Sequence, residues 1–122
     1  MHAYTPAQVV EETGFSLDTL RYYERIGLLD RVGRNSAGVR RFTDDDLDWL
    51  SVIRCLRETG MPIAEMMRFA ELVRGGDRTI GERIALLEEH HRRVGEQIAN
   101  LRDQRRYIER KIAYYREVSP ST

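Results

Sequence analysis

Large side chains recur at alternating steps of four and three residues from Ile80 to Tyr115. A run of about five heptads predicts one long helix with a continuous apolar seam. At about 1.5 Å per residue, a helix over residues 80–116 would be roughly 55 Å long, with nothing of its own to bury the seam against. We therefore predict that two copies of the chain pair through the seam, rather than that the helix folds back on its own domain. The predicted dimer positions are Ile84, Leu87, His91, Val94, Ile98, Leu101, Arg105, Ile108 and Ile112.

Two polar residues lie within this seam. His91 and Arg105 both take the first seam position of their heptads, one heptad on either side of Ile98. Polar seam residues cost stability and can fix the register or the orientation of paired helices. If the two helices run antiparallel about Ile98, His91 of one chain lies near the level of Arg105 of the other. We expect His91 to be neutral there, because a protonated imidazole beside a guanidinium is unfavourable.

Residues 16–27 predict a short helix with clear ends. Ser16 is a good N-cap, and Gly27 suits the end of the helix. Leu20 and Tyr23 fall on one side, and the opposite side is polar and aromatic. A helix with an apolar back and such a front fits the major groove of DNA. The residues of this stretch that we predict to contact DNA are Ser16, Asp18, Thr19, Arg21, Tyr22 and Arg25.

A basic hairpin is predicted directly after this helix, with strands near residues 31–34 and 39–42. Residues 28–42 hold four arginines and one acid, Asp30, a net charge of +3 (4 − 1). A hairpin of this charge is typical of a wing that lies along the phosphate backbone. The alternative to DNA contact is that the outer faces of the helix and the hairpin are ordinary solvent-exposed surface. The predicted wing contacts are Arg34, Arg40 and Arg41.

The segment before the helix favours the DNA-binding interpretation. Residues 5–8 form a capping-box pattern with proline at the first helical position, which predicts a helix to about residue 12. Residues 13–15 predict a turn in which Gly14 supplies a positive φ and Phe15 points into the core. A helix, a short glycine turn and a second capped helix make up a helix-turn-helix, whose second helix reads the DNA.

Two connecting helices are predicted after the hairpin. The first begins at Thr43 and ends before Gly60, and the second covers residues 63–74. Residues 79–82 form a further capping-box pattern, which opens the long helix. The predicted buried positions are Leu47, Trp49, Leu50, Val52, Ile53 and Leu56 in the first helix, and Met66, Met67, Ala70 and Val73 in the second.

The predicted fold is therefore mainly α. A winged helix-turn-helix DNA-binding domain with its connecting helices is expected over residues 1–76. A C-terminal dimerisation helix, paired as an antiparallel coiled coil and followed by a short tail, is expected over residues 77–122.

Chain-wide totals disfavour several classes of protein. Lysine plus arginine and aspartate plus glutamate number 20 each, so indiscriminate binding to nucleic acid is disfavoured while a local basic face is not. The single cysteine fits a reducing compartment, and with no apolar run of membrane-span length we expect a cytoplasmic protein without a membrane partner. The sequence holds no cysteine pair, catalytic triad or phosphate loop. We expect no metal, no cofactor, no catalytic residue and no enzyme activity.

Several motifs together resemble the MerR family of bacterial transcriptional regulators. They are Tyr4-Thr5, SLDTLRYYERIGLL at 16–29, Gly38-Val39-Arg40-Arg41-Phe42, Asp46-Leu47 and Gly60-Met61-Pro62-Ile63. The resemblance covers nearly the whole chain, and the Arg-Tyr-Tyr-Glu run followed by Gly-Leu-Leu is highly specific. Two positions depart from the family pattern, since Val39 stands where the family has tyrosine and Pro62 stands where a serine cap is usual.

This resemblance implies a homodimer that binds a palindrome in a promoter whose polymerase recognition elements are too far apart. An effector would make the dimer kink and untwist the DNA, which brings the elements onto one face for RNA polymerase. Phosphate contacts over both arms would offset the cost of deformation. Carried over by position, Arg21 and Tyr22 would contact groove and phosphates, and Arg40 or Arg41 would be a wing contact.

The resemblance leaves the effector open. Metal-responsive relatives hold their ion with thiolates near the ends of the long helix, where this sequence has none, and drug-sensing relatives carry a large C-terminal domain. Cys55 resembles the thiol of short aldehyde- and electrophile-responsive members, and Arg54 and Arg57 would favour its thiolate if they turned toward it. The competing interpretation makes Cys55 a small hydrophobe at a packing boundary.

Two other functions stay open at this point. One is an architectural protein that bends DNA without sensing an effector, like winged-helix excisionases. The other is an oligomerisation module with a vestigial helix-turn-helix. Promoter output that ignores metals, aldehydes and oxidants would favour the first, and DNA binding that tolerates loss of Arg21 or Arg41 would favour the second.

Overall fold

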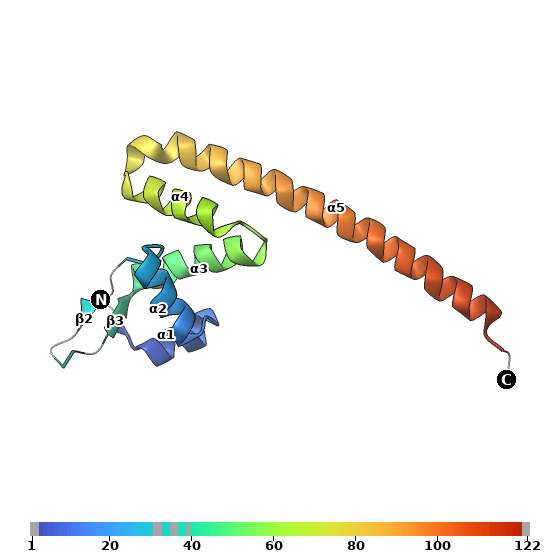
Figure 1. Cartoon of the computed structure of the whole chain (residues 1–122), viewed down its shortest axis with the longest axis horizontal. Helices are drawn as coiled ribbons and strands as arrows, with labels where there is room; N and C mark the ends of the chain where they lie inside the picture. Colours follow the sequence, from blue (N-terminus) through green and yellow to red (C-terminus); the bar gives the residue numbers. More distant parts are fainter. Residues whose placement is uncertain (1–2, 31–32, 35–36, 39, 121–122) are drawn as a thin grey trace. The chain divides into compact units, whose positions relative to one another are not determined.

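The computed structural model describes residues 3–30, 33–34, 37–38 and 40–120, which form a mainly helical chain (Figure 1). The chain forms two compact units, Met1–Arg83 and Ile84–Thr122. The mainly α class with a long C-terminal helix is confirmed, and the functional division between residues 76 and 77 stays a prediction. In chain order the elements are β1 (Ala3–Tyr4), α1 (Pro6–Thr13), α2 (Leu17–Ile26), β2 (Gly33–Arg34), β3 (Arg40–Thr43), α3 (Asp44–Glu58), α4 (Ile63–Arg74), the 3₁₀ turn η1 (Asp77–Thr79) and α5 (Ile80–Val118).

Local caps define the first two helices, as the sequence predicts. The Thr5 hydroxyl accepts the Gln8 backbone N–H at 3.2 Å, and the Gln8 side-chain oxygen accepts the Thr5 N–H at 2.8 Å. The helices α1 and α2 end at Gly14 and Gly27, whose φ angles are 76° and 86°. Because a side chain with Cβ is strained in this left-handed conformation, glycine lets each helix stop within one residue.

Three short strands form one antiparallel sheet in the order β1-β3-β2. Ala3 pairs with Thr43 and Gly33 pairs with Arg41. The predicted hairpin is thus confirmed where it is described. The sequence does not predict strand β1, because two residues are too few to show an alternating pattern. Parts of the predicted hairpin lie outside the described residues, namely residues 31–32, 35–36 and 39.

The core of the Met1–Arg83 unit draws on each of the helices α1 to α4. On α3, Leu50, Ile53 and Leu56 are buried as predicted. The Trp49 ring stacks on the Phe69 ring of α4, with centroids 5.7 Å apart and 9° between the ring planes. The largest fully buried side chains are Val9, Leu20, Leu28, Leu29, Phe42, Leu50 and Ile53.

The buried face of α4 differs from the predicted one. Met66 and Ala70 are buried, whereas Val73 is 37% exposed and the prediction for it is wrong. Phe69 and Leu72 are buried in its place. The helix α4 contacts both α3 and η1, and its buried face is therefore shifted from the apolar stripe that its spacing predicts.

Four other predicted core positions are also less buried than expected. Val52 on α3 is 40% exposed, so its prediction is wrong. Leu47 and Trp49 on α3 and Met67 on α4 are only half-buried. Val52 and Val73 instead line an open cleft between α3 and α4.

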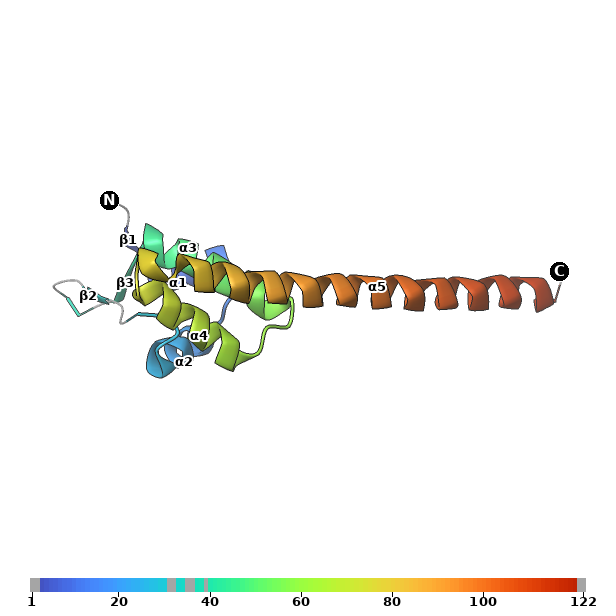
Figure 2. The same cartoon turned by 90° about the horizontal axis from the view of Figure 1, so that it is seen from above.

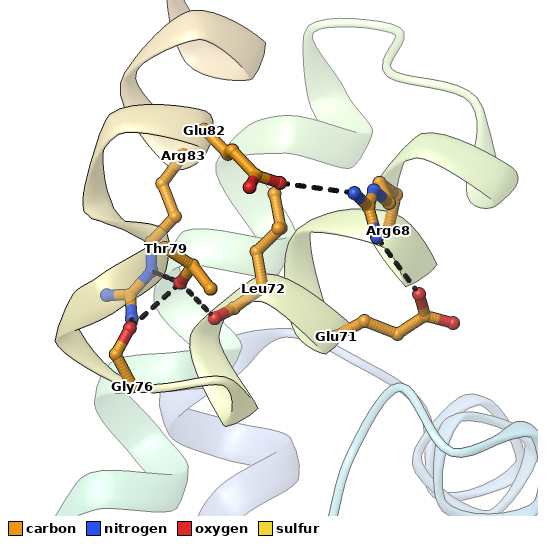
Figure 3. Close-up of polar contacts among 7 residues, drawn as sticks. All are labelled: Arg68, Glu71, Leu72, Gly76, Thr79, Glu82 and Arg83. Carbon is orange, nitrogen blue, oxygen red and sulfur yellow. Dashed lines mark hydrogen bonds and ion pairs between the residues drawn. The ribbon is translucent and has the colours of Figure 1, made fainter.

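The turn η1 and the start of α5 are bonded back to α4 (Figure 3). The Thr79 hydroxyl bonds to the Leu72 carbonyl of α4, and Arg83 donates to the same hydroxyl at 3.0 Å. The Glu82 carboxylate lies 3.2 Å from the Arg68 guanidinium of α4. The Thr79 N–H donates to the carbonyl three residues earlier. The capping box predicted over residues 79–82 is therefore wrong, because Glu82 and the Thr79 N–H have other partners.

The helix α5 is unbroken over 39 residues (Figure 2), which confirms the predicted long helix. Nothing in the described part of the chain combines the length and apolar character that a membrane-spanning helix requires. Along α5 most of the large apolar side chains of the predicted seam are exposed in the single chain, and Val94 is half-buried. The exposed ones are Ile84, Leu87, Ile98, Leu101, Ile108 and Ile112.

Candidate nucleic-acid interface

The outer face of α2 carries cationic and aromatic side chains. Tyr22 is 42% exposed, and the Arg25 guanidinium lies 5.4 Å from the centre of the Tyr22 ring. The Arg21 guanidinium lies 3.9 Å from the Asp18 carboxylate, and both side chains are exposed, so this ion pair is weak. The predicted polar front of α2 is therefore confirmed as a solvent-facing surface.

Two other predicted contact residues form the N-terminal cap of α2. The Ser16 hydroxyl accepts the Thr19 N–H at 3.1 Å and donates to the Thr19 hydroxyl at 2.9 Å. These bonds satisfy groups that the first turn of a helix leaves unpaired. Ser16 and Thr19 thus set where α2 begins, and contact of their hydroxyls with DNA stays a prediction.

Side chains from α3 hold the turn between α1 and α2. Arg54 donates to the Thr13 backbone carbonyl at 2.8 Å. Gly14 lies against the same guanidinium, since a Cβ there would be 3.4 Å from an Arg54 nitrogen. The Arg57 guanidinium lies 5.7 Å from the centre of the Phe15 ring. Sequence reasoning missed these positioning residues, because no local motif links α3 to a turn about forty residues earlier.

Two side chains hold the other end of α2. Arg74 of α4 donates to the Gly27 carbonyl and lies 3.0 Å from the Asp30 carboxylate. The Trp49 indole N–H of α3 donates to the Leu28 carbonyl at 2.8 Å. The helix α2 is therefore anchored at its start and at its end by α3 and α4, and its outer face is presented from a fixed support.

The strands of the wing follow α2 in the chain and carry further arginines. Arg34 and Arg40 are register partners in β2 and β3, but their side chains lie outside the described part of the chain. Arg41 is half-buried. The Tyr4 hydroxyl donates to the Asp44 carboxylate at 2.7 Å, which joins β1 to the first turn of α3 and raises the pKa of Tyr4. The wing sheet is thus tied to the same helix that holds α2.

Comparison with known proteins identifies the family. The family described as "MerR HTH family regulatory protein" matches residues 4–72, and the one described as "MerR, DNA binding" matches residues 47–111. The chain belongs to the MerR HTH family. A Haemophilus influenzae relative, named an uncharacterized HTH-type transcriptional regulator, is 52% identical to this MerR-family chain over 85 residues, which are 70% of the chain and 63% of the relative. The Bacillus subtilis HTH-type transcriptional regulator AdhR is 36% identical over 86 residues, which are 70% of the chain and 61% of AdhR.

Solved structures of MerR-family proteins share the fold. The crystal structure of HiNmlR, described as a MerR family regulator lacking the sensor domain and bound to promoter DNA, is 46% identical with a TM-score of 0.88. It covers 94% of this chain, and the match spans 87% of HiNmlR. A MerR family regulator from Listeria monocytogenes is 33% identical with a TM-score of 0.84, over 92% of this chain and 85% of the other. The curated relatives are matched over less than two thirds of their own length, and both are named as regulators.

Cys55 of this MerR-family chain is exposed on α3. Whether Cys55 is a sensing thiol or a small hydrophobe at a packing boundary stays a prediction. Arg54 pairs with Glu58 at 2.8 Å as well as with the turn, and Arg57 lies over Phe15, so both guanidinium groups have partners other than the thiol. Among the residues that the structure describes, no group of three His, Cys, Asp or Glu side chains could hold a metal ion.

Proposed function

We propose that this chain is a cytoplasmic transcriptional regulator that binds a promoter palindrome as a homodimer and distorts the DNA in response to an effector. In this proposal it has no enzyme activity, and RNA polymerase is the partner that responds to the distortion. The observation that carries the proposal is the outer face of α2, with Arg21, Tyr22 and Arg25 exposed on a helix anchored at both ends.

The fixed support of α2 suits sequence reading. Base edges in the major groove are read by a few side chains whose position is set by phosphate contacts and by the protein scaffold. Arg21 and Arg25 supply guanidinium groups for guanine edges or phosphates, and the basic strand β3 supplies the wing contact. HiNmlR, which is bound to promoter DNA in its crystal, is 46% identical, and this similarity supports the same class of ligand here.

The exposed seam of α5 supports a homodimer. Ile98 and Ile108 are 45% and 57% exposed in the single chain. Complete burial of a side chain of this size contributes about 1.5–3 kcal/mol, and about half of that surface is still exposed at each position, so pairing with a second copy of the seam is favourable. A two-fold dimer would present two α2 helices at a fixed separation, which matches a palindromic site.

In this proposal the two α2 helices are connected through the paired α5 helices, and this connection is what allows the dimer to distort the DNA. Bending a site of 20–30 base pairs by 40–90° costs about 1–6 kcal/mol, which contacts from two α2 faces and two wings are sufficient to offset. An effector that changes the angle between the two reading units would then change the shape of the bound DNA.

Cys55 is the proposed sensor within this mechanism. An aldehyde adds to the thiol when a bond forms between sulfur and the carbonyl carbon, while the thiol proton moves to the carbonyl oxygen, so no oxidant is needed. Support comes from the exposure of Cys55 and from its place on α3 next to Arg54, which holds the turn before α2. An adduct on α3 beside Arg54 would alter how α2 is held.

The test of DNA binding compares Arg21→Ala with the parent chain. An operator is first selected from a random duplex library with the full-length protein, and its affinity is measured over a range of salt concentrations. We expect roughly tenfold weaker binding and a salt slope smaller by about two, because each of the two chains loses one guanidinium that neutralises a phosphate. The control is Arg106→Ala, because Arg106 is also exposed and ion-paired with a neighbouring acid, Asp103, but lies on α5.

If Arg21→Ala leaves both affinity and salt dependence unchanged, α2 does not read DNA and the proposal fails in favour of an oligomerisation module. If operator binding depends on Arg21 but promoter output ignores aldehydes, metals and oxidants, the architectural DNA-bending alternative is favoured.

A further inference from the structure

A cleft of about 380 Å³ lies between α3 and α4 in the N-terminal unit. Its apolar walls are Trp49 and Val52 of α3, Ala70 and Val73 of α4, and Leu29 from the segment that follows α2. Small-molecule sites in proteins are typically about 300–1,000 Å³ with mostly apolar walls. The cleft explains why Val52 and Val73 are exposed although their spacing predicts burial.

The rim of the cleft is acidic. The cleft is lined by one guanidinium, that of Arg74, together with four carboxylates, those of Asp30, Asp45, Asp46 and Asp48. The Asp46 carboxylate also accepts the Thr43 N–H in the cap of α3. Arg74 is already paired with Asp30, and its N–H groups point to the carbonyl at the end of α2. Asp45 and Asp48 are exposed in the first turns of α3. The excess of carboxylates attracts a cation to the mouth of the cleft and repels an anion.

An aromatic wall in the cleft is held rigidly. The Trp49 indole N–H is bonded to the Leu28 carbonyl at 2.8 Å, and the ring is stacked on Phe69. Trp49 lines the cleft, and because its ring is already fixed, the part of the ring that Phe69 leaves uncovered needs no ordering when a ligand binds. Cations associate favourably with the face of tryptophan. The cleft therefore combines an apolar surface, an aromatic face and negative charge, the features that recognise an organic cation.

We propose that this cleft is an effector site for an organic cation with an apolar body, such as an aryl- or alkylammonium ion. Its regulatory part rests on the function proposed above. Trp49 and Arg74 line the cleft and also bond to the Leu28 and Gly27 carbonyls at the end of α2. A ligand that shifts either side chain changes how α2 is held, and so favours one position of the reading helix over another.

Binding is tested first on the full chain without DNA. The probe is benzyltrimethylammonium, and the readout is the fluorescence of Trp49, the only tryptophan of the chain and a wall of the cleft. We expect a saturable change in Trp49 fluorescence with the cation, and no saturable change with benzoate, which has a similar ring and the opposite charge.

Variants test whether the fluorescence change comes from binding in the cleft. In Asp45→Asn/Asp48→Asn we expect about tenfold weaker binding of the probe, because two carboxylates at the rim lose their charge. Val52→Arg places a cation in the wall and is expected to remove the saturable signal. The control Glu11→Gln/Glu88→Gln removes two exposed carboxylates elsewhere and should bind the probe like the parent chain. Circular dichroism and thermal melting establish that each variant is folded.

Absence of a saturable signal, or equal affinity in Asp45→Asn/Asp48→Asn, would overturn the proposed cation site. Conversion of the protein to a monomer by Val52→Arg would also overturn it, since a second copy of the chain would then occupy the cleft. Saturating probe is expected to change operator affinity by about fivefold or more, and an unchanged affinity would overturn the effector role. If the protein binds no operator at all, the proposed function fails while the fluorescence result still decides the cation site.

Discussion

Arg54 and Cys55 are exposed neighbours on α3. The Arg54 guanidinium bonds to the Thr13 carbonyl and to Glu58. One residue thus supports the turn before the reading helix, and the next is accessible to a small electrophile. At the residue scale, a reaction of the Cys55 thiol would therefore take place one residue away from Arg54, whose bond to the Thr13 carbonyl positions α2.

The residue-scale prediction concerns Cys55→Ser. The hydroxyl is a weaker nucleophile than the thiolate, so induction of a reporter promoter by formaldehyde or methylglyoxal should fall to the uninduced level. The matched control is Ser51→Ala, which changes another exposed side chain one turn earlier on α3. Induction that is the same in Cys55→Ser and in the parent chain would remove the thiol from the mechanism.

The helix α4 shows how a second contact surface changes which residues a helix buries. Phe69 stacks on Trp49 of α3, and the C-terminal part of α4 contacts η1, where Thr79 bonds to the Leu72 carbonyl. The buried face of α4 is therefore shifted from its apolar stripe. Leu72 is consequently buried, and Val73, the next residue, is left at the cleft.

At the scale of this element, we predict that Leu72→Ala lowers the free energy of unfolding by about 2–4 kcal/mol, because it leaves a cavity in the core. Val73→Ala should cost less than about 1 kcal/mol, since truncation of an exposed valine removes little buried surface. Urea denaturation followed by circular dichroism measures both values. Equal destabilisation of the two variants would mean that α4 buries the face that its sequence spacing predicts.

In the single chain, two surfaces of different character are exposed to solvent. The outer face of α2 is cationic and aromatic, and the seam of α5 is apolar. In the proposed function the first surface contacts DNA, and the second pairs with a second copy of the chain. Binding to a palindrome requires both, because only a dimer presents two reading helices.

At the scale of the whole molecule, we predict that Ile98→Asp converts the protein into a monomer. Two carboxylates would face each other near the middle of the paired seams, where burial of charge is costly. Sedimentation at micromolar concentration should give a dimer for the parent chain and a monomer for the variant. Asn100→Asp, which adds the same charge next to the seam positions but outside them, is the control and should remain dimeric.

Orientation of the two helices is tested by disulfide formation in a Cys55→Ser background. Antiparallel pairing about Ile98 brings position 84 of one chain near position 112 of the other. Ile84→Cys/Ile112→Cys should therefore crosslink two chains, and Ile84→Cys alone should not. Efficient crosslinking by the single variant would indicate parallel helices and would contradict the proposed dimer.

Residue order is sufficient to place most helix ends in this protein. Thr5, Ser16 and Thr43 cap helices through bonds to residues three positions later, and Gly14 and Gly27 end them through their own backbone. Such bonds are local, so residue type and spacing predict them. The seam of α5 and the polar front of α2 are predictable for the same reason, since both depend only on the helical period.

The contacts between the helices and strands depend instead on how segments that are distant in the sequence pack together. The bonds from Arg54, Trp49 and Arg74 that anchor α2 join residues 41, 21 and 47 positions apart in the sequence. Strand β1 exists because β3 is there to pair with it, and the cleft at Val52 and Val73 needs walls from both α3 and α4. Contacts between distant segments leave no periodic signal in either segment, and they appear only when the chain has folded.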